Sequence, residues 1–209
     1  MQARSLDFLW DPEDPPSKRN LLSAALTLFA EQGVQAVNVR AVAERAGYTN
    51  PALFKFFPTK DALGLHLFER CYLELGHALA RAVRPNASFD ETFHELLSAQ
   101  DRFVQTHPAA WFFLQEHARL YWARVPTAVS RLSSARLLDR VLRKGIVEGA
   151  VDESLDVDVA VAALMGAFQQ FARARSLGGL RDGRAPRVAS LEALLRRMLA
   201  PSRSRSKGS

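Results

Sequence analysis

Residues 33–63 read GVQAVNVRAVAERAGYTNPALFKFFPTKDAL, and this stretch decides the fold. Asn38 is a favourable N-cap for a short helix, and Gly47 suits the left-handed residue that ends one. Thr49 can cap the next helix, so only Gly47 and Tyr48 separate the two. Two short helices with so small a gap, preceded by another helix, have the spacing of a helix-turn-helix.

Helical periodicity continues on both sides of this stretch. We predict an all-α fold in which an N-terminal three-helix helix-turn-helix domain precedes a larger helical domain. The predicted domains are a flexible arm over 1–16, the helix-turn-helix domain over 17–63, the larger helical domain over 64–200 and a disordered basic tail over 201–209. The helices expected outside the helix-turn-helix span about 17–33, 59–83, 89–107, 109–124, 128–148, 157–177 and 188–199.

The N-terminal arm combines acidic residues with several prolines, which favours a mobile segment. It also contains four apolar side chains, so the sequence leaves open whether the arm docks on the rest of the chain. These are Leu6, Phe8, Leu9 and Trp10.

Composition limits the function classes. The chain has 209 residues, 48% of them hydrophobic and 24% charged, which is typical of a globular protein. No run is apolar and long enough to span a membrane, and the acidic N-terminus does not resemble a secretory signal. A single cysteine, Cys71, fits a reducing compartment, so we expect a cytoplasmic protein that makes no membrane contact.

Positive charge is concentrated in the helix-turn-helix segment. The formal charge is −3 over residues 1–16, +4 over 17–60, +2 over 61–200 and +3 over 201–209. Local basic charge favours a polyanionic partner such as DNA. On the third helix, Asn50, Ala52 and Lys55 are side chains that can meet base edges. Asn38, Thr49 and Lys60 can reach phosphates, although a plain three-helix bundle with solvated lysines would share this pattern.

Taken together, these residues resemble the N-terminal signature of TetR-family transcriptional regulators. The matching positions are Gly33, Val39, Arg40, Val42, Ala43, Ala46, Gly47, Thr49, Leu53, Phe57, Lys60, Asp61 and Leu63. Gly145, Ile146 and Gly149 also resemble the stretch before the penultimate helix of that family. The resemblance implies a homodimer that binds a palindromic double-stranded DNA operator and is released by a small effector, most often acting as a repressor. It makes 17–63 the DNA-binding domain and 64–200 the dimerisation and effector-binding domain.

The resemblance also assigns roles to single residues. It places Asn38, Thr49, Phe54, Phe56 and Lys60 at phosphate-facing positions, and Asn50, Pro51, Ala52 and Lys55 at base-facing ones. Two positions depart from the family pattern, because Phe54 stands where Tyr is usual and Pro51 where Gly is common. We therefore expect one phosphate hydrogen bond to be missing and the operator to differ from that of better-matched relatives.

The dimer interface and the effector pocket are less clearly marked. Small residues at helical spacing favour an interface formed by residues 128–148 and 157–177, although they also suit a crowded core. The candidate ligand-binding residues are His94, Gln100, Trp111, Phe113, His117, Tyr121 and Trp122. Apolar walls with few polar groups are typical of pockets, but aromatic stripes also form cores. A DNA-binding regulator without an effector therefore stays open, and the ligand cannot be named.

An enzymatic function finds little support. The pairs Glu74 with His77 and Glu91 with His94 have the spacing of ligands in di-metal carboxylate bundles, which need two further glutamates from other helices. No nucleophile elbow, phosphate-binding loop or Cys-x-x-Cys motif is present. We expect no catalysis, no cofactor and no metal.

Overall fold

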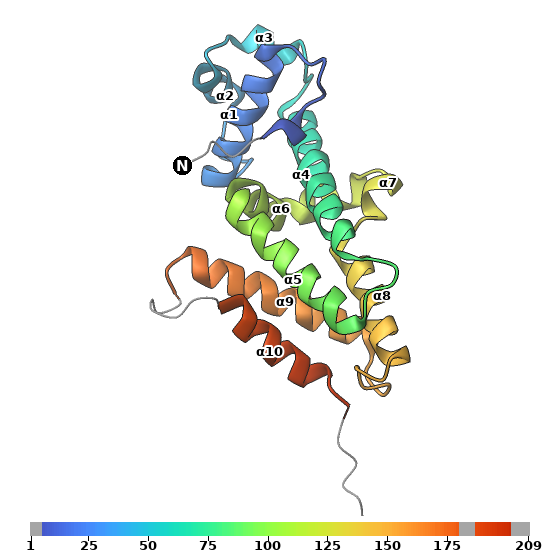
Figure 1. The fold of residues 1–209 in the computed structure, drawn as a ribbon. Coiled ribbons are helices and arrows are strands. Elements are labelled where there is room, and N and C mark those ends of the chain that lie inside the picture. Colours follow the sequence, from blue (N-terminus) through green and yellow to red (C-terminus); the bar gives the residue numbers. More distant parts are fainter. Residues whose placement is uncertain (1–5, 180–186, 202–209) are drawn as a thin grey trace, which may run out of the picture. The chain divides into compact units, whose positions relative to one another are not determined.

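The computed structural model describes residues 6–179 and 187–201, which form helices joined by loops (Figure 1). No strand occurs in the part of the chain so described, and the predicted all-α class is confirmed. The predicted basic tail lies almost wholly outside the described residues. The helices are α1 Pro16–Gln32, α2 Val39–Ala46, α3 Asn50–Phe54, α4 Lys60–Ala82, α5 Phe89–Thr106, α6 Pro108–Tyr121, α7 Thr127–Ser130, α8 Ser134–Val147, α9 Val157–Ser176 and α10 Arg187–Leu199, with 3-10 turns η1 Asp7–Leu9 and η2 Trp122–Arg124.

The chain divides into two compact units. Unit 1 comprises residues 1–77 and 103–132, and unit 2 comprises residues 78–102 and 133–209. The domain boundaries predicted from the sequence, with a break after residue 63, stay a prediction. In unit 1, helix α6 packs against α1 of the helix-turn-helix, so this unit holds more of the chain than the three N-terminal helices alone.

The core of unit 1 is aromatic. Phe29 and Phe113 stack with ring centroids 6.2 Å apart, and Phe68 meets Tyr121 at 5.6 Å. The Tyr121 hydroxyl points at Gly64 of α4, where an added Cβ atom would lie only 2.1 Å from the Oη atom. Glycine is therefore needed at this position because α4 and α6 approach each other so closely.

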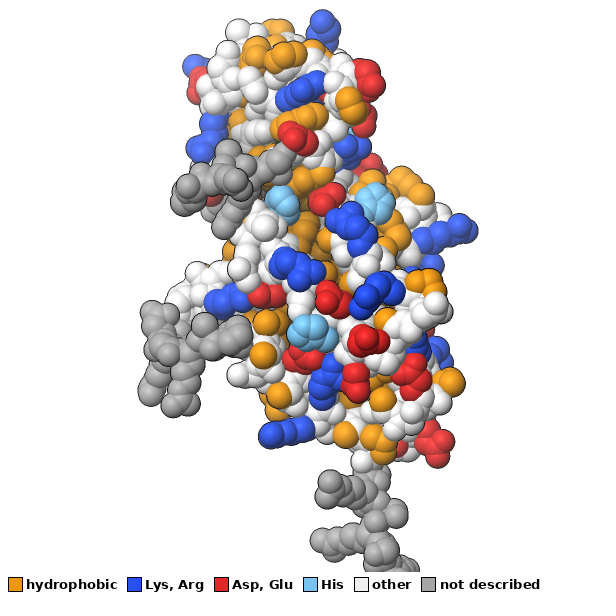
Figure 2. All heavy atoms as spheres, viewed as in Figure 1, with side chains coloured by type: hydrophobic (Ala, Val, Ile, Leu, Met, Phe, Trp, Pro, Cys, Tyr) orange, Lys and Arg blue, Asp and Glu red, His pale blue; other side chains and the backbone are white. Residues whose placement is uncertain are grey.

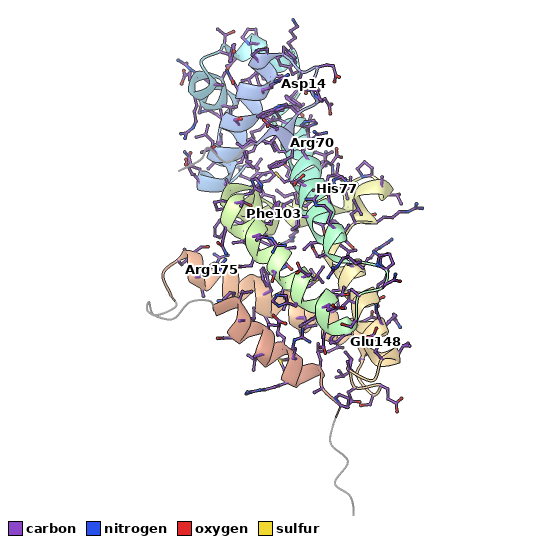
Figure 3. All side chains as sticks on the ribbon, viewed as in Figure 1. Asp14, Arg70, His77, Phe103, Glu148 and Arg175 are labelled. Atoms are coloured by element: carbon purple, nitrogen blue, oxygen red, sulfur yellow. The ribbon has the colours of Figure 1, made fainter. Side chains whose placement is uncertain are left out.

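The core of unit 2 is mainly aliphatic and is bordered by ion pairs. Helix α9 packs against α8 and α10. The Arg196 guanidinium pairs with the carboxylates of Asp90 and Glu192, and the His94 ring bonds Glu192 at 2.8 Å. These contacts hold α10 against α5, and Arg175 near the C-terminal end of α9 pairs with Asp101 at 2.6 Å (Figure 3).

Two predicted helices are shorter than expected. The helix predicted over 128–148 is interrupted between α7 and α8, because the Ser133 hydroxyl caps a new helix by accepting the N–H of Arg136 at 3.2 Å. The helix predicted over 109–124 ends at Tyr121 and continues as η2, just before Pro126. No helix within residues 6–179 and 187–201 is both long and apolar enough to cross a membrane.

The described part of the N-terminal arm is docked within unit 1. Leu9 is fully buried. The Arg70 guanidinium of α4 donates to the backbone oxygens of Phe8 at 2.6 Å and Trp10 at 2.7 Å, and the His66 ring bonds Leu9 O at 3.3 Å. Of the four apolar residues that stood out in the sequence, Leu9 thus belongs to the core, while Leu6, Phe8 and Trp10 are partly buried.

Candidate nucleic-acid interface

The turn between α2 and α3 has the predicted caps at Asn38 and Gly47, whereas the side chain of Thr49 makes no capping hydrogen bond to α3 within the described residues. The Asn38 Oδ1 atom accepts the N–H of Ala41 at 2.8 Å and caps α2. Gly47 has φ +78°, a left-handed conformation that side chains other than glycine rarely adopt, and it ends α2. The N–H of Tyr48 then bonds Ala43 O at 2.8 Å. This turn sets the direction in which α3 leaves α2.

Helix α3 is anchored by two side chains and exposes others. Leu53 is fully buried and Phe57 nearly so. Thr49, Pro51 and Lys55 are exposed, and Phe54 keeps 48% of its surface in solvent. Figure 2 shows basic and hydrophobic side chains side by side at the end of unit 1 that carries α3. Such a surface can meet phosphates and the apolar edges of bases.

Other predicted DNA-facing residues lie deeper. Asn50, Ala52 and Phe56 are half-buried. The Oδ1 atom of Asn50 is buried and has no hydrogen-bond partner in the described part of the chain, which costs on the order of 1–3 kcal/mol. Asn50 is the first residue of α3, and an unpaired buried oxygen there is consistent with a group that is hydrogen-bonded by a ligand.

Lys60 is engaged inside unit 1. Its ammonium donates to the backbone oxygens of Val37 at 2.9 Å and Gln35 at 3.2 Å. A lysine has three donors, so one remains for a phosphate. The sequence predicted only the phosphate role, whereas the structure adds a role in holding the loop between α1 and α2.

The same loop is also held from α6. The backbone N–H of Val34 donates to the Nε2 atom of His117 at 3.0 Å, and both groups are buried. His117 Nδ1 is buried and has no hydrogen-bond partner among the described residues. A ring nitrogen that accepts an N–H is unprotonated, so this contact requires neutral imidazole. His117, predicted to line a pocket, therefore positions the loop that leads to Asn38.

The start of α4 is fixed by an ion pair. The Arg124 guanidinium of η2 binds the Asp61 carboxylate through two parallel hydrogen bonds of 2.9 and 2.6 Å. The hydrogen bond from Arg124 holds the pKa of Asp61 below its usual value, although some burial opposes the shift. The helix that follows α3 thus begins at a defined place within unit 1.

Sequence reasoning assigned no role to two exposed cations on α2. Arg40 is paired with Glu44 at 2.7 Å on the surface, and Arg45 is exposed in the last turn of the helix. The net charge of residues 17–60 contained this signal, because it exceeded what Lys55 and Lys60 alone supply. Both arginines can add phosphate contacts beside α3.

The seven candidate ligand-binding residues do not form one group. Five belong to unit 1, and two, His94 and Gln100, belong to unit 2. His94 is largely exposed and Trp122 is partly so, the latter lying against Tyr72 with ring centroids 4.9 Å apart. The other four residues in unit 1 are buried in its core: Trp111, Phe113, His117 and Tyr121. The pocket role of the seven residues stays a prediction, and for these four the structure shows core packing.

Gln100 lines a small cavity in unit 2. The cavity has a volume of about 20 Å³, which is room for about one water molecule. Ser134 is the other polar residue at its wall, and the remaining residues are apolar: Leu79, Phe93, Leu96, Leu97, Leu138, Leu164, Met165, Phe168 and Leu195. No group of three or more His, Cys, Asp or Glu residues suited to a metal ion occurs within the described ranges.

The comparison with known proteins agrees with the helix-turn-helix described above. The family model for bacterial regulatory proteins of the tetR family matches residues 21–67. An uncharacterised HTH-type regulator, YhgD of Bacillus subtilis, is 26% identical over 64% of this chain and 71% of its own length. The repressor KstR2 of Rhodococcus jostii is 25% identical over 68% of this chain and 72% of its own. The crystal structure of FadR from Bacillus subtilis in complex with stearoyl-CoA has a TM-score of 0.66, 17% identity and coverage of 85% of this chain and 97% of FadR.

Proposed function

We propose that this chain, which belongs to the TetR family of transcriptional regulators, represses transcription by binding a palindromic DNA operator as a homodimer. The observation that carries the proposal is the surface of α3. Buried Leu53 and Phe57 hold the helix in place, so that Phe54 and Lys55 are presented to solvent within a basic segment. Catalysis is not part of this function, because the relatives are named as transcriptional regulators.

Dimerisation is supported by an unpartnered apolar face in unit 2. On α9, Val159 is 64% exposed, and Ala162, Ala163 and Gly166 follow on the same side at helical spacing. Leu194 and Met198 of α10 are also more than half exposed. By contrast, the solvent side of α8 carries three arginines: Arg136, Arg140 and Arg143. We therefore place the interface on α9 and α10, rather than on the pair 128–148 and 157–177 expected from the sequence.

Two substitutions on exposed apolar residues test the interface. Leu194→Glu should convert the dimer to monomers, because it places charge in the middle of the proposed contact. Val147→Glu is the matched control, since Val147 is 88% exposed at the end of α8. Sedimentation velocity measures the oligomeric state. If Leu194→Glu stays dimeric like the control, the interface does not lie on this face.

The operator is tested by selecting duplexes from a random pool with the purified chain at near-physiological salt. We expect an enriched palindrome whose half-site centres lie about 34 to 36 Å apart, or a multiple of this distance. Enrichment of no sequence would contradict operator recognition.

Two lysine variants then separate base from phosphate contacts. Lys55→Ala should change affinity in a sequence-dependent way, whereas Lys60→Ala should weaken all duplexes about equally and lower the salt slope by about one. Arg140→Ala, an exposed cation of unit 2, controls for the change in net charge. Equal behaviour of the two lysine variants would contradict this division of roles.

We further propose that an apolar effector releases the protein from DNA. The support is the lining of the cavity in unit 2, where mainly apolar walls surround Gln100 and Ser134, and the stearoyl-CoA bound by the structurally similar FadR. Long-chain acyl thioesters are the first class to screen for release of the selected operator. Gln100→Leu should change the ligand preference and leave DNA affinity without ligand unaltered.

A regulator without an effector is the second candidate, and the size of the cavity favours it. Ligand sites measure roughly 300–1,000 Å³, whereas this cavity measures about 20 Å³, which is room for about one water molecule. An effector would therefore have to open the core of unit 2. Release of operator DNA by any acyl thioester supports sensing, and the absence of release across the class supports the second candidate.

A further inference from the structure

Residues Asp11 to Asp14 precede α1 and form an acidic turn. This turn binds two basic side chains of that helix. The Asp14 carboxylate accepts the Lys18 ammonium at 2.8 Å. The Arg19 guanidinium donates to the backbone oxygens of Asp14 at 2.7 Å and Pro12 at 2.5 Å. In the free protein, both cations of the first turn of α1 are therefore occupied from within the chain.

The acidic turn has a defined structure. The N–H of Asp14 donates to Asp11 O at 3.0 Å, and the N–H of Asp11 donates to Asp14 Oδ2 at 3.0 Å. Pro12 occupies the second position of the turn, where its fixed φ is favourable. Burial opposes ionisation of Asp14, but the hydrogen bonds from Lys18 and Asp11 hold the pKa of its carboxyl below the usual value. Asp14 is thus anionic at neutral pH and can stand in for a phosphate.

The acidic turn is tied to α4 as well as to α1. Arg70 binds the preceding backbone through Phe8 and Trp10 and reaches the Asp11 carboxylate at 3.1 Å, while Leu9 is buried beneath it (Figure 3). Removing one charge from the turn should therefore leave the segment in place.

The covered cations lie close to the DNA-facing surface. Lys18 Nζ is 6.0 Å from the centre of the Phe57 ring, and Phe57 follows α3 by three residues. Figure 3 places Asp14 at the end of unit 1 that carries α3. Lysine and arginine at such a position are suited to bind a DNA phosphate.

We propose that Lys18 and Arg19 form an additional phosphate-binding site for DNA, and that the acidic turn occupies this site in the free protein. As long as the Asp14 carboxylate holds Lys18, this lysine cannot bind a phosphate, so the unaltered chain binds DNA without the Lys18 contact. The turn lowers affinity for every duplex by a similar factor, because phosphates carry no sequence information. It thereby limits binding to non-operator DNA, and the inference rests on the proposed DNA-binding function.

The test measures binding of a fluorescent 30-base-pair duplex of random sequence across a salt series. Asp14→Asn should raise affinity about fivefold at 0.1 M salt and steepen the log–log salt slope by about 0.9, the value for one added phosphate contact. Glu13→Gln is the matched control, because Glu13 is exposed in the same turn and carries the same charge. It should change affinity less than about twofold and leave the slope unaltered.

Adding Lys18→Gln to Asp14→Asn should remove the gain, since Lys18 is the cation that Asp14→Asn frees. Lys18→Gln alone should change affinity little, because Asp14 already neutralises that lysine. Three results would each overturn the inference. They are an equal gain in affinity for Glu13→Gln, no gain in affinity for Asp14→Asn, and a lower affinity with a shallower salt slope for Lys18→Gln alone. If the unaltered chain bound no duplex at all, the proposed function itself would be wrong.

Discussion

The two units bury their side chains in different ways. Unit 1 packs aromatic rings closely and closes its core with a neutral hydrogen bond from Val34 to His117. Unit 2 packs mainly leucines around a cavity of about 20 Å³, and ion pairs surround that core. Unit 1 is thus a closely packed aromatic core, whereas the aliphatic walls of unit 2 leave a small cavity that the proposed effector would have to open.

Paired alanine substitutions test this contrast with the largest expected effect. Phe113 in unit 1 and Phe168 in unit 2 are both fully buried. Phe113→Ala should lower the free energy of unfolding by about 4 kcal/mol and Phe168→Ala by about 3 kcal/mol, because flexible Leu and Met side chains collapse into a void more easily than rings. Urea denaturation measures both, and a larger loss for Phe168→Ala would reverse the contrast.

Close packing in unit 1 is tested at Gly64. Gly64→Ala should cost about 3 kcal/mol of unfolding free energy, because the new methyl group overlaps the Tyr121 hydroxyl. Tyr121→Phe in the same chain removes that hydroxyl and should restore part of the stability. If Gly64→Ala unfolds like the unaltered chain, α4 and α6 do not pack as closely as described.

The neutral hydrogen bond is tested at His117. His117→Leu should cost about 2 kcal/mol, because the buried N–H of Val34 loses its acceptor. It should also weaken operator binding, since the loop that is released carries the Asn38 cap. His94→Leu is the control in unit 2, because His94 is largely exposed. Equal losses in the two variants would show that burial of the hydrogen bond is unimportant.

The smallest effect is a pH dependence that we assign to unit 1. Burial lowers the pKa of His66 below the usual 6.5, and the nearby charges of Lys18 and Arg70 act in the same direction, against the Leu9 hydrogen bond and Asp14. The unfolded chain therefore binds the proton more readily, so stability is lost as the pH falls from 6.5 toward the lower folded pKa. His66→Gln should reduce the loss between pH 7.5 and 5.5, whereas His94→Gln should retain it.

Local signals predicted the helix-turn-helix well. The caps at Asn38 and Gly47 and the buried pair Leu53 and Phe57 depend on neighbours a few residues away, which sequence spacing encodes directly. The roles of Lys60 and His117 could not be predicted in this way. Their partners, Val37 and Val34, are 23 and 83 residues away along the chain.

The aromatic composition of α6 predicted that its side chains are buried, but not whether they line a pocket or fill a core. A pocket wall and a solid core use the same residue types, and only the packing of neighbouring helices decides whether space remains between them. This is why Trp111 and Tyr121 appeared to be pocket candidates and proved to be core residues. Gln100 was chosen for a polar group on an apolar face, and it does line the cavity of unit 2.

The sequence by itself determined the helical class, the helix-turn-helix and the resemblance to TetR-family regulators, because periodicity, capping and a short motif are local properties. The tertiary structure alone decided that the N-terminal arm is docked, because Arg70 of α4 binds the backbone oxygens of Phe8 and Trp10, which lie 62 and 60 residues earlier in the chain. It also decided which apolar side chains stay exposed on α9 and α10. These features depend on contacts between residues that lie far apart along the chain, and such contacts leave no local pattern in the sequence.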